Sequence, residues 1–156
     1  MAKRMSKRMI GMTYDMGYLP IILASNTGNT RTFISFIQEH TKRDLQVIED
    51  FNNPFPNNNR LAIGSYTWGN GKIPKRLKEY LIENHLQLYG KEIFIFGSGN
   101  SVYPKFCGAV EGIKKICLDC GADVIAAFKF EQRFNQQKLT EQELYNLIGS
   151  IKYWSR

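Results

Sequence analysis

Three loops of the sequence carry residue types that could together hold a phosphorylated, planar ligand, and the first loop spans residues 25–30. This turn follows an apolar run and precedes an amphipathic one, which is typical of a strand that feeds a helix. Its hydroxyls, amides and backbone N–H groups, with the positive end of the helix dipole, would converge on one phosphate. The turn lacks the GxxxxGK[ST] pattern of triphosphate-binding loops, so it predicts a monophosphate. Its residues are Ser25, Asn26, Thr27, Gly28, Asn29 and Thr30.

The other two loops add aromatic side chains and glycines. Two facing aromatics, Trp68 and Tyr103, can sandwich a planar heterocycle, while neighbouring glycines let main-chain groups approach its polar edge. Each aromatic taken alone is more simply a surface residue, but beside a phosphate-binding turn the pair favours a cofactor site. The second loop contains Ser65, Tyr66, Thr67, Trp68, Gly69, Asn70 and Gly71, and the third contains Gly97, Ser98, Gly99, Asn100 and Tyr103.

Alternating strands and helices position these loops. Five apolar segments predict strands at residues 21–24, 45–48, 61–64, 93–96 and 124–128. Helical periodicity predicts helices over about 31–41, from Pro74 to near 85, from about 106 to Gly121, and after a capping box at 140–143. A turn-rich loop is expected at 52–59. The pattern implies a doubly wound parallel sheet covered on both faces, with ligands beyond the carboxyl ends of the strands.

The composition is that of one folded domain. The chain has 156 residues, 43% of them hydrophobic, and a net charge of +7. No apolar run reaches the roughly 20 residues that a membrane helix needs, and no basic stripe indicates nucleic acid. We therefore expect a cytoplasmic domain at 17–156 that binds neither membrane nor nucleic acid. Residues 1–16 are basic and rich in methionine without the apolar core of a signal peptide, so we expect a disordered extension.

The cysteines and histidines do not form a convincing catalytic or metal site. Cys117 and Cys120 have the CxxC spacing of redox and zinc sites, but they fall at a predicted helix end without a second pair. His40, His85 and the carboxylates form no visible dyad or triad, so a hydrolase is not expected. The odd number of cysteines favours free thiols in a reduced compartment.

At these loops the sequence resembles the flavodoxin family, and the likeness extends from about residue 19 to residue 130. The turn at 25–30 is similar to the family's FMN phosphate loop. Residues 67–71, TWGNG, are similar to its TWGDG loop, and Gly97 to Asn100, Tyr103 and the FCGAV run at 106–110 are similar to its third loop. The resemblance implies FMN as the cofactor and a flavodoxin-like doubly wound sheet of five parallel strands in the order 2-1-3-4-5.

The resemblance also implies roles for individual residues. The turn at 25–30 would hold the phosphate, and Trp68 and Tyr103 would flank the isoalloxazine. The Gly69 carbonyl would turn toward flavin N5 on reduction, and Asn100 with nearby main chain would contact the pyrimidine edge. The implied cofactor-binding set comprises Ser25, Asn26, Thr27, Gly28, Asn29, Thr30, Ser65, Tyr66, Thr67, Trp68, Gly69, Asn70, Gly71, Ser98, Gly99, Asn100, Tyr103, Phe106 and Cys107.

The sequence departs from ordinary flavodoxins in its charges. Asn70 and Asn100 stand where flavodoxins commonly carry Asp, and basic side chains surround the predicted mouth of the site. Because positive charge favours the anionic, fully reduced flavin, that state should be easier to reach than in an acidic flavodoxin. Local likeness at 27–33, 73–81, 98–100 and 129–131 resembles the NrdI branch. The basic residues are Lys72, Lys75, Arg76 and Lys105.

Three functions remain open on the sequence. The leading one is a non-enzymatic FMN shuttle that passes electrons between a reductase donor and an acceptor protein. The second, implied by the NrdI likeness, is a flavoprotein that supplies superoxide from reduced FMN to the dimanganese small subunit of class Ib ribonucleotide reductase. The third is a flavodoxin-like binding module without cofactor.

Overall fold

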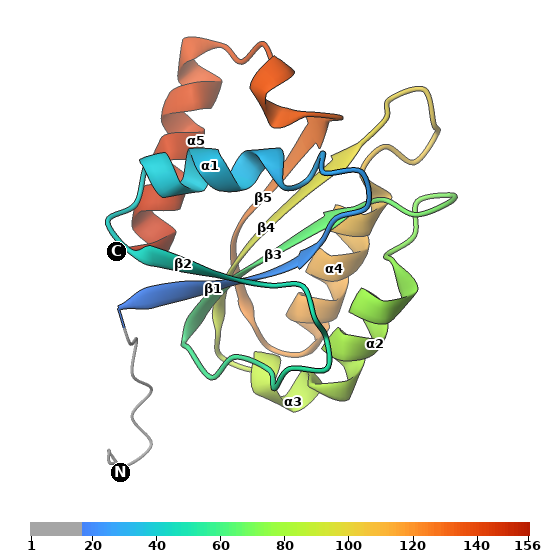
Figure 1. Cartoon of the computed structure of the whole chain (residues 1–156), viewed down its shortest axis with the longest axis vertical. Coiled ribbons are helices and arrows are strands. Elements are labelled where there is room, and N and C mark those ends of the chain that lie inside the picture. Colours follow the sequence, from blue (N-terminus) through green and yellow to red (C-terminus); the bar gives the residue numbers. More distant parts are fainter. Residues whose placement is uncertain (1–16) are drawn as a thin grey trace.

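The computed structural model describes residues 17–156, and the extension expected over residues 1–16 lies outside the described residues. One parallel sheet has the strand order β2-β1-β3-β4-β5, with helices on both of its faces (Figure 1). This order confirms the predicted doubly wound, five-stranded arrangement. The strands are β1(Tyr18–Ala24), β2(Asp44–Ile48), β3(Arg60–Tyr66), β4(Glu92–Gly99) and β5(Asp123–Glu131). The helices are α1(Thr32–Glu39), α2(Lys75–Glu83), α3(His85–Leu88), α4(Gly108–Asp119) and α5(Glu141–Trp154), with a 3-10 turn η1(Phe134–Gln136).

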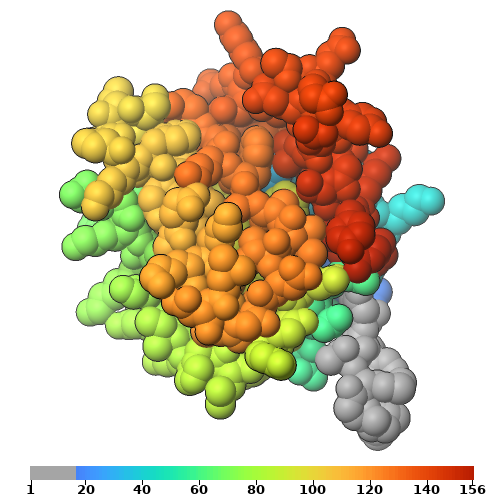
Figure 2. Space-filling model, turned by 180° about the vertical axis from the view of Figure 1, so that it is seen from behind, coloured from blue at the N-terminus to red at the C-terminus, as the bar shows by residue number. Residues whose placement is uncertain are grey.

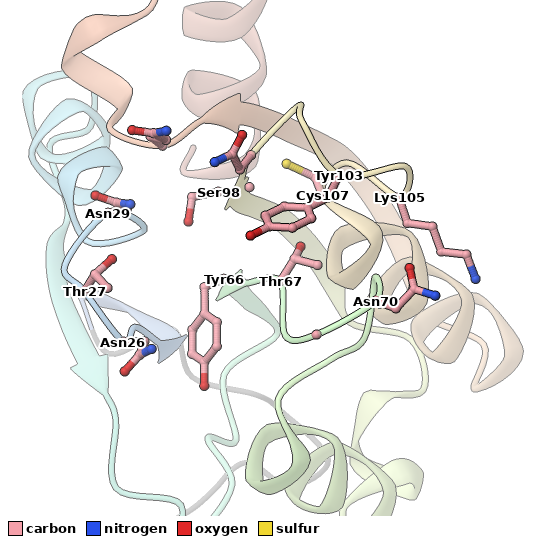
Figure 3. Close-up of a pocket in the computed structure, with 14 residues that line it drawn as sticks. Asn26, Thr27, Asn29, Tyr66, Thr67, Asn70, Ser98, Tyr103, Lys105 and Cys107 are labelled. Atoms are coloured by element: carbon pink, nitrogen blue, oxygen red, sulfur yellow. The ribbon is translucent and has the colours of Figure 1, made fainter.

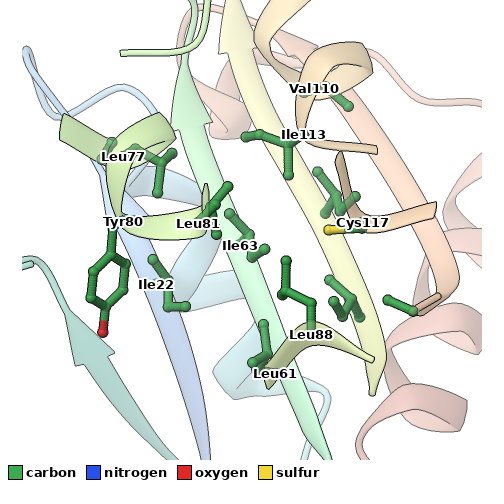
Figure 4. Packing of buried hydrophobic residues seen from close by; sticks show 14 of the residues in the cluster. Ile22, Leu61, Ile63, Leu77, Tyr80, Leu81, Leu88, Val110, Ile113 and Cys117 are labelled. Carbon is green, nitrogen blue, oxygen red and sulfur yellow. The ribbon is translucent and has the colours of Figure 1, made fainter. Parts of the chain in front are cut away.

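Two apolar layers hold the sheet between its helices. Successive side chains of a strand point to opposite faces, so Ile63 of β3 packs under α2, α3 and α4 while its neighbour Ala62 faces α1 and α5. Figure 4 shows the first layer, in which Leu77 and Leu81 of α2 lie against the central strands. The central strands β3 and β4 are buried on both faces, which explains their continuous apolar sequence.

An aromatic cluster connects α1 to the chain segment that follows β5. The ring of Phe33 lies 4.7 Å from that of Phe134 and 5.0 Å from that of Phe96, measured between centroids. The backbone N–H of Phe134 also donates to Thr32 Oγ1 at 2.8 Å. The start of α1, directly after the turn at 25–30, is therefore braced by η1, a 3-10 turn that the sequence patterns did not predict.

The turn-rich loop expected at 52–59 connects β2 to β3 without an intervening helix. Tyr80 of α2 anchors this loop. Its hydroxyl donates to the carbonyl oxygens of Asn53 at 3.1 Å and Pro54 at 3.2 Å, and the ring of Phe51 stacks on it with 5.0 Å between centroids. Although this connection contains no helix, aromatic packing on Tyr80 of α2 holds it against the rest of the protein.

The helix expected from Pro74 to near residue 85 is broken into α2 and α3. At Asn84 the side-chain Nδ2 donates to the carbonyl of Tyr80 at 2.8 Å, so the amide competes with the backbone for a helical acceptor. The capping box predicted before α5 is confirmed, because Glu143 N donates to Thr140 Oγ1 at 3.0 Å and Thr140 N donates to Glu143 Oε1 at 2.8 Å. No helix among residues 17–156 is long and apolar enough to cross a membrane.

Candidate functional site

The three loops that carry the predicted chemistry meet at the carboxyl edge of the sheet and enclose a pocket of about 630 Å³ (Figure 3). β1, β3 and β4 each end at this edge, so the loops that follow them converge there. The volume lies within the range of small-molecule and cofactor sites, about 300–1,000 Å³. The lining residues are Asn26, Thr27, Asn29, Tyr66, Thr67, Gly69, Asn70, Ser98, Gly99, Asn100, Tyr103, Lys105, Cys107 and Gln132.

The turn at 25–30 presents unused donors beside this pocket. Ser25 Oγ is buried and has no hydrogen-bond partner within the described part of the chain. Between residues 17 and 156, the backbone N–H groups of Thr27, Gly28 and Asn29 donate to no backbone carbonyl either. Gly28 has a φ of +88°, which lets the turn curl toward the start of α1. A buried hydroxyl normally has a partner, so this turn fits an anion that accepts several hydrogen bonds.

A hydrogen bond across 68 residues of sequence fixes the first loop to the third. Thr30 Oγ1 and Ser98 Oγ lie 2.7 Å apart, and both residues are buried. Thr32 Oγ1 donates to the carbonyl of Asn29 at 2.6 Å and holds the end of the turn against α1. These contacts orient the turn toward the interior of the pocket before any ligand is bound.

The second loop is a tight hairpin. Trp68 N donates to the Lys72 carbonyl at 2.7 Å, and Lys72 N donates to the Trp68 carbonyl at 2.8 Å. Gly69 and Gly71 both have positive φ, +50° and +77°. A Cβ on Gly71 would lie 2.6 Å from Lys105 Cβ, and a Cβ on Gly108 would lie 2.6 Å from the Gly71 oxygen. The second and third loops therefore pack so closely that glycine is required where they touch.

The third loop is stabilised by its own turn and by β5. Tyr103 N donates to the Asn100 carbonyl at 3.1 Å, and Ser101 N donates to Glu131 Oε1 at 3.0 Å. Gln132 N donates to the Gly99 carbonyl at 2.8 Å, which brings Gln132 into the pocket wall. Sequence reasoning missed Gln132 because no motif surrounds it, although the end of a fifth parallel strand must reach the same edge.

Cys107 lines the floor of the pocket in a left-handed conformation, with a φ of 52°. Its Sγ lies 3.7 Å from the carbonyl oxygens of Gly97 and Phe130. Burial raises the pKa of this thiol to about 11, so it is protonated at neutral pH and does not act as a nucleophile. Burial likewise raises the pKa of Cys117 to about 12. Over residues 17–156, no cluster of His, Cys, Asp and Glu is suited to hold a metal ion.

The predicted site residues divide into two groups. Most line the pocket directly, whereas seven lie behind or beside it. Thr30 and Ser65 are buried behind the pocket, and Trp68 belongs to the second loop with 57% of its surface exposed. Tyr103 lines the pocket and is 62% exposed, so the stacking role expected for the two aromatics stays a prediction. The seven that do not line the pocket are Ser25, Gly28, Thr30, Ser65, Trp68, Gly71 and Phe106.

The pocket wall carries no acidic side chain. Of its fourteen lining residues, Lys105 is the charged one, and Asn70 and Asn100 line the pocket with uncharged side chains. Lys72 and Lys75 are exposed close by. The electrostatic environment therefore favours an anionic ligand and any additional negative charge that it acquires.

Known proteins match the chain in sequence and in fold. Residues 21–146 match the family model described as Flavodoxin. A probable flavodoxin 2 of Bacillus subtilis (strain 168) is 28% identical over 141 residues, covering 84% of this chain and 91% of the relative. The solved oxidised flavodoxin 2 from Bacillus cereus has a TM-score of 0.68 at 25% identity, covering 87% of this chain and 98% of that one.

Two further known proteins resemble the chain, one in fold and one in sequence. A Fusobacterium nucleatum flavodoxin solved with flavin mononucleotide shares the fold, with a TM-score of 0.58 and 20% identity over 90% of this chain and 95% of that one. The protein NrdI of Bacillus licheniformis is 25% identical over 131 residues, covering 83% of this chain and 90% of the relative.

Proposed function

Because the chain belongs to the flavodoxin family, we propose that it binds FMN in the pocket at the carboxyl edge of the sheet and carries electrons between redox partner proteins. The observation that carries the proposal is the convergence of three loops on one pocket, with unused hydrogen-bond donors in the first of them. A phosphate needs those donors, and the pocket is large enough for a flavin beside it.

The chain's own residues bind and orient the cofactor. The hydroxyl of Ser25 and the N–H groups of the turn at 25–30 would hold the phosphate, while the Thr30–Ser98 hydrogen bond keeps that turn aimed at the pocket. Asn70 and Asn100 line the space that the ring would occupy. FMN, when bound, supplies the electron-transfer chemistry itself.

Three further residues would control the surroundings of the ring. Gly69, at a φ of +50°, gives its peptide group the freedom to change orientation. The exposed side chains of Trp68 and Tyr103 would cover the faces of the ring and exclude water. A Trp68→Ala variant should then bind FMN more weakly and show altered potentials, and unchanged titrations would remove Trp68 from the site.

The absorption spectrum of the purified protein tests the proposal most directly. A yellow protein, or a colourless one that quenches flavin fluorescence on addition of FMN, is the expected result. A protein that stays colourless and leaves added FMN unaffected would contradict it and favour the cofactor-free binding module.

A second candidate is an NrdI-type role, in which the reduced flavoprotein supplies superoxide to the dimanganese small subunit of class Ib ribonucleotide reductase. The observations that favour it are the distant NrdI relative and the pocket wall without carboxylates. A pull-down with that subunit at low salt, together with oxygen consumption by the reduced protein, separates the two roles. Oxygen consumption without binding leaves the electron carrier as the function.

A further inference from the structure

Four basic side chains lie on the loops that form the pocket or directly after them, and three of the four have no acidic partner among residues 17–156. We name as the basic rim the residues Lys72, Lys75, Arg76 and Lys105. Within residues 17–156, the carboxylates form no ion pair with Lys72, Lys75 or Lys105. Arg76 approaches Glu79 at 4.0 Å, but both side chains are largely exposed and such a pair contributes little. The rim therefore presents positive charge to whatever approaches the pocket.

The position of two of these cations is unfavourable for the fold itself. Lys75 and Arg76 are the first two residues of α2, and the first turn of that helix has no acidic residue. The amino end of a helix carries a partial positive charge, so cations there are repelled while Asp or Glu would be stabilising. The helix dipole thus gives no reason for Lys75, and Arg76 gains only the exposed pair with Glu79, so both cations are available to a group outside the chain.

Exposed apolar side chains lie on the loops beside this charge. Trp68 and Tyr103 are more than half exposed, and Val102 is 77% exposed. Figure 2 shows the loop around residues 100–105 next to the loop around residues 68–72 at one margin of the molecule. Gly71 and Lys105 are in close contact there, so the two loops form one surface. Aromatic groups ringed by charge are typical of a protein interface.

We propose that this surface docks acidic redox partners, with the basic rim pairing with Asp and Glu side chains of the partner around a contact centred on Trp68, Val102 and Tyr103. The inference rests on the proposed function, because an electron carrier must bring its cofactor to a donor and an acceptor. Complementary charge speeds such encounters and selects among partners. Because an electron carrier exchanges electrons with other proteins, we infer that the anionic group that docks here is an acidic protein surface.

The test uses the FMN-loaded full chain, labelled for amide NMR and titrated with decaglutamate as the acidic probe. Amide shifts should be confined to residues 68–76 and 99–106. The double variant Lys75→Glu/Arg76→Glu should weaken probe binding by about tenfold or more, because it replaces attraction by repulsion.

The matched control is Lys42→Glu/Lys152→Glu, which makes the same change of net charge at exposed lysines near the opposite, amino edge of the sheet. This control should weaken binding by less than about twofold if docking is local rather than a net-charge effect. Equal weakening by both double variants, or shifts spread over the surface, would overturn the proposal. Tighter binding of an oligothymidylate to the same residues would overturn the assignment of an acidic protein.

The outcome is separable from that of the proposed function. Neither Lys75 nor Arg76 lines the pocket, so the double variant should still take up FMN, and its FMN affinity is measured separately by fluorescence quenching. A chain that fails to take up FMN would refute the electron carrier, whereas the probe titration, repeated on that FMN-free chain, still decides whether the rim is a docking surface.

Discussion

The buried hydroxyl of Ser25 destabilises the ligand-free protein, and a bound phosphate would supply the hydrogen-bond partner that it lacks. Its buried hydroxyl has no partner among the described residues, and an unsatisfied buried polar group costs about 1–3 kcal/mol. We predict that Ser25→Ala leaves the FMN-free protein as stable as the parent or more stable, yet weakens FMN binding by roughly tenfold. Urea unfolding of the apoprotein and fluorescence titration measure the two effects.

The control is Ser35→Ala, at an exposed position on α1, which should leave FMN binding unchanged and raise stability only by the few tenths of a kcal/mol, roughly, that helix propensity gives. Loss of stability in the FMN-free Ser25→Ala protein would show that the hydroxyl already has a structural partner, and the phosphate role would then have no support.

Asn70 tests the electrostatic consequence of a pocket without carboxylates. A unit charge about 8 Å from the ring, at an effective dielectric near 20, corresponds to at most ~90 mV for a one-electron step. We predict that Asn70→Asp lowers the potential of the second reduction of FMN by tens of millivolts, because it disfavours the anionic reduced cofactor. Spectroelectrochemical titration measures the shift.

The titration requires that the variant still binds FMN and that a control outside the pocket is measured beside it. The conservative change keeps the size of residue 70, so loss of cofactor is not expected to mask the result. Lys152→Gln, on α5 and outside the pocket wall, should leave both potentials unchanged. A potential that rises in Asn70→Asp would contradict the proposed electrostatic effect.

At the scale of elements, the close approach of the second and third loops predicts a contrast between two glycines. A Cβ on Gly108 would meet the backbone of Gly71 at 2.6 Å, whereas a Cβ on Gly149 in α5 would meet nothing within 4 Å. Gly108→Ala should destabilise the protein and weaken FMN binding by separating the loops. Gly149→Ala should stabilise it by about 0.5–1 kcal/mol, the usual gain in a helix interior. Thermal unfolding and FMN titration of both variants check the contrast, and equal effects would argue against loop contact.

How far the sequence predicts these elements depends on whether their signal is local. The apolar runs located all five strands, and Thr140 located the start of α5 through its capping box. The break between α2 and α3 falls at Asn84, whose side chain and backbone N–H both donate to the Tyr80 carbonyl, and apolar periodicity does not register such a contact. Gln132 enters the pocket through the pairing of Gly99 with Glu131 in neighbouring strands, a relation between distant segments.

At the scale of the whole molecule, Glu92 links the sheet to the carboxyl end of the chain. Arg60 Nε donates to Glu92 Oε1 at 3.0 Å, and Arg156 Nη2 donates to both carboxylate oxygens at 3.1 Å. Partial burial alone would raise the pKa of Glu92, but the hydrogen bonds from the two arginines outweigh it and the pKa is lowered from 4.5. The carboxylate therefore stabilises the fold above pH 4.5, and this contribution is lost as the pH falls through the lower folded value.

We predict that Glu92→Gln is less stable than the parent at neutral pH and that the difference disappears in acid, once the pH has fallen through the lowered pKa of Glu92 in the folded protein. Urea unfolding at a series of pH values measures the stability difference at neutral pH and its loss in acid. Glu83→Gln, at an exposed carboxylate for which the described residues offer no ion pair, serves as the control and should follow the parent. A difference that is constant with pH would mean that packing, rather than charge, accounts for the role of Glu92.

The contact between η1 and the start of α1 gives the protein an internal reporter of ligand binding. The amide hydrogen of Phe134 is held by Thr32 Oγ1, directly beyond the turn at 25–30. Whatever rigidifies that turn must slow the opening that exposes this hydrogen to solvent. Hydrogen–deuterium exchange at Phe134, about a hundred residues away in sequence, should therefore slow when the phosphate end of the cofactor is in place.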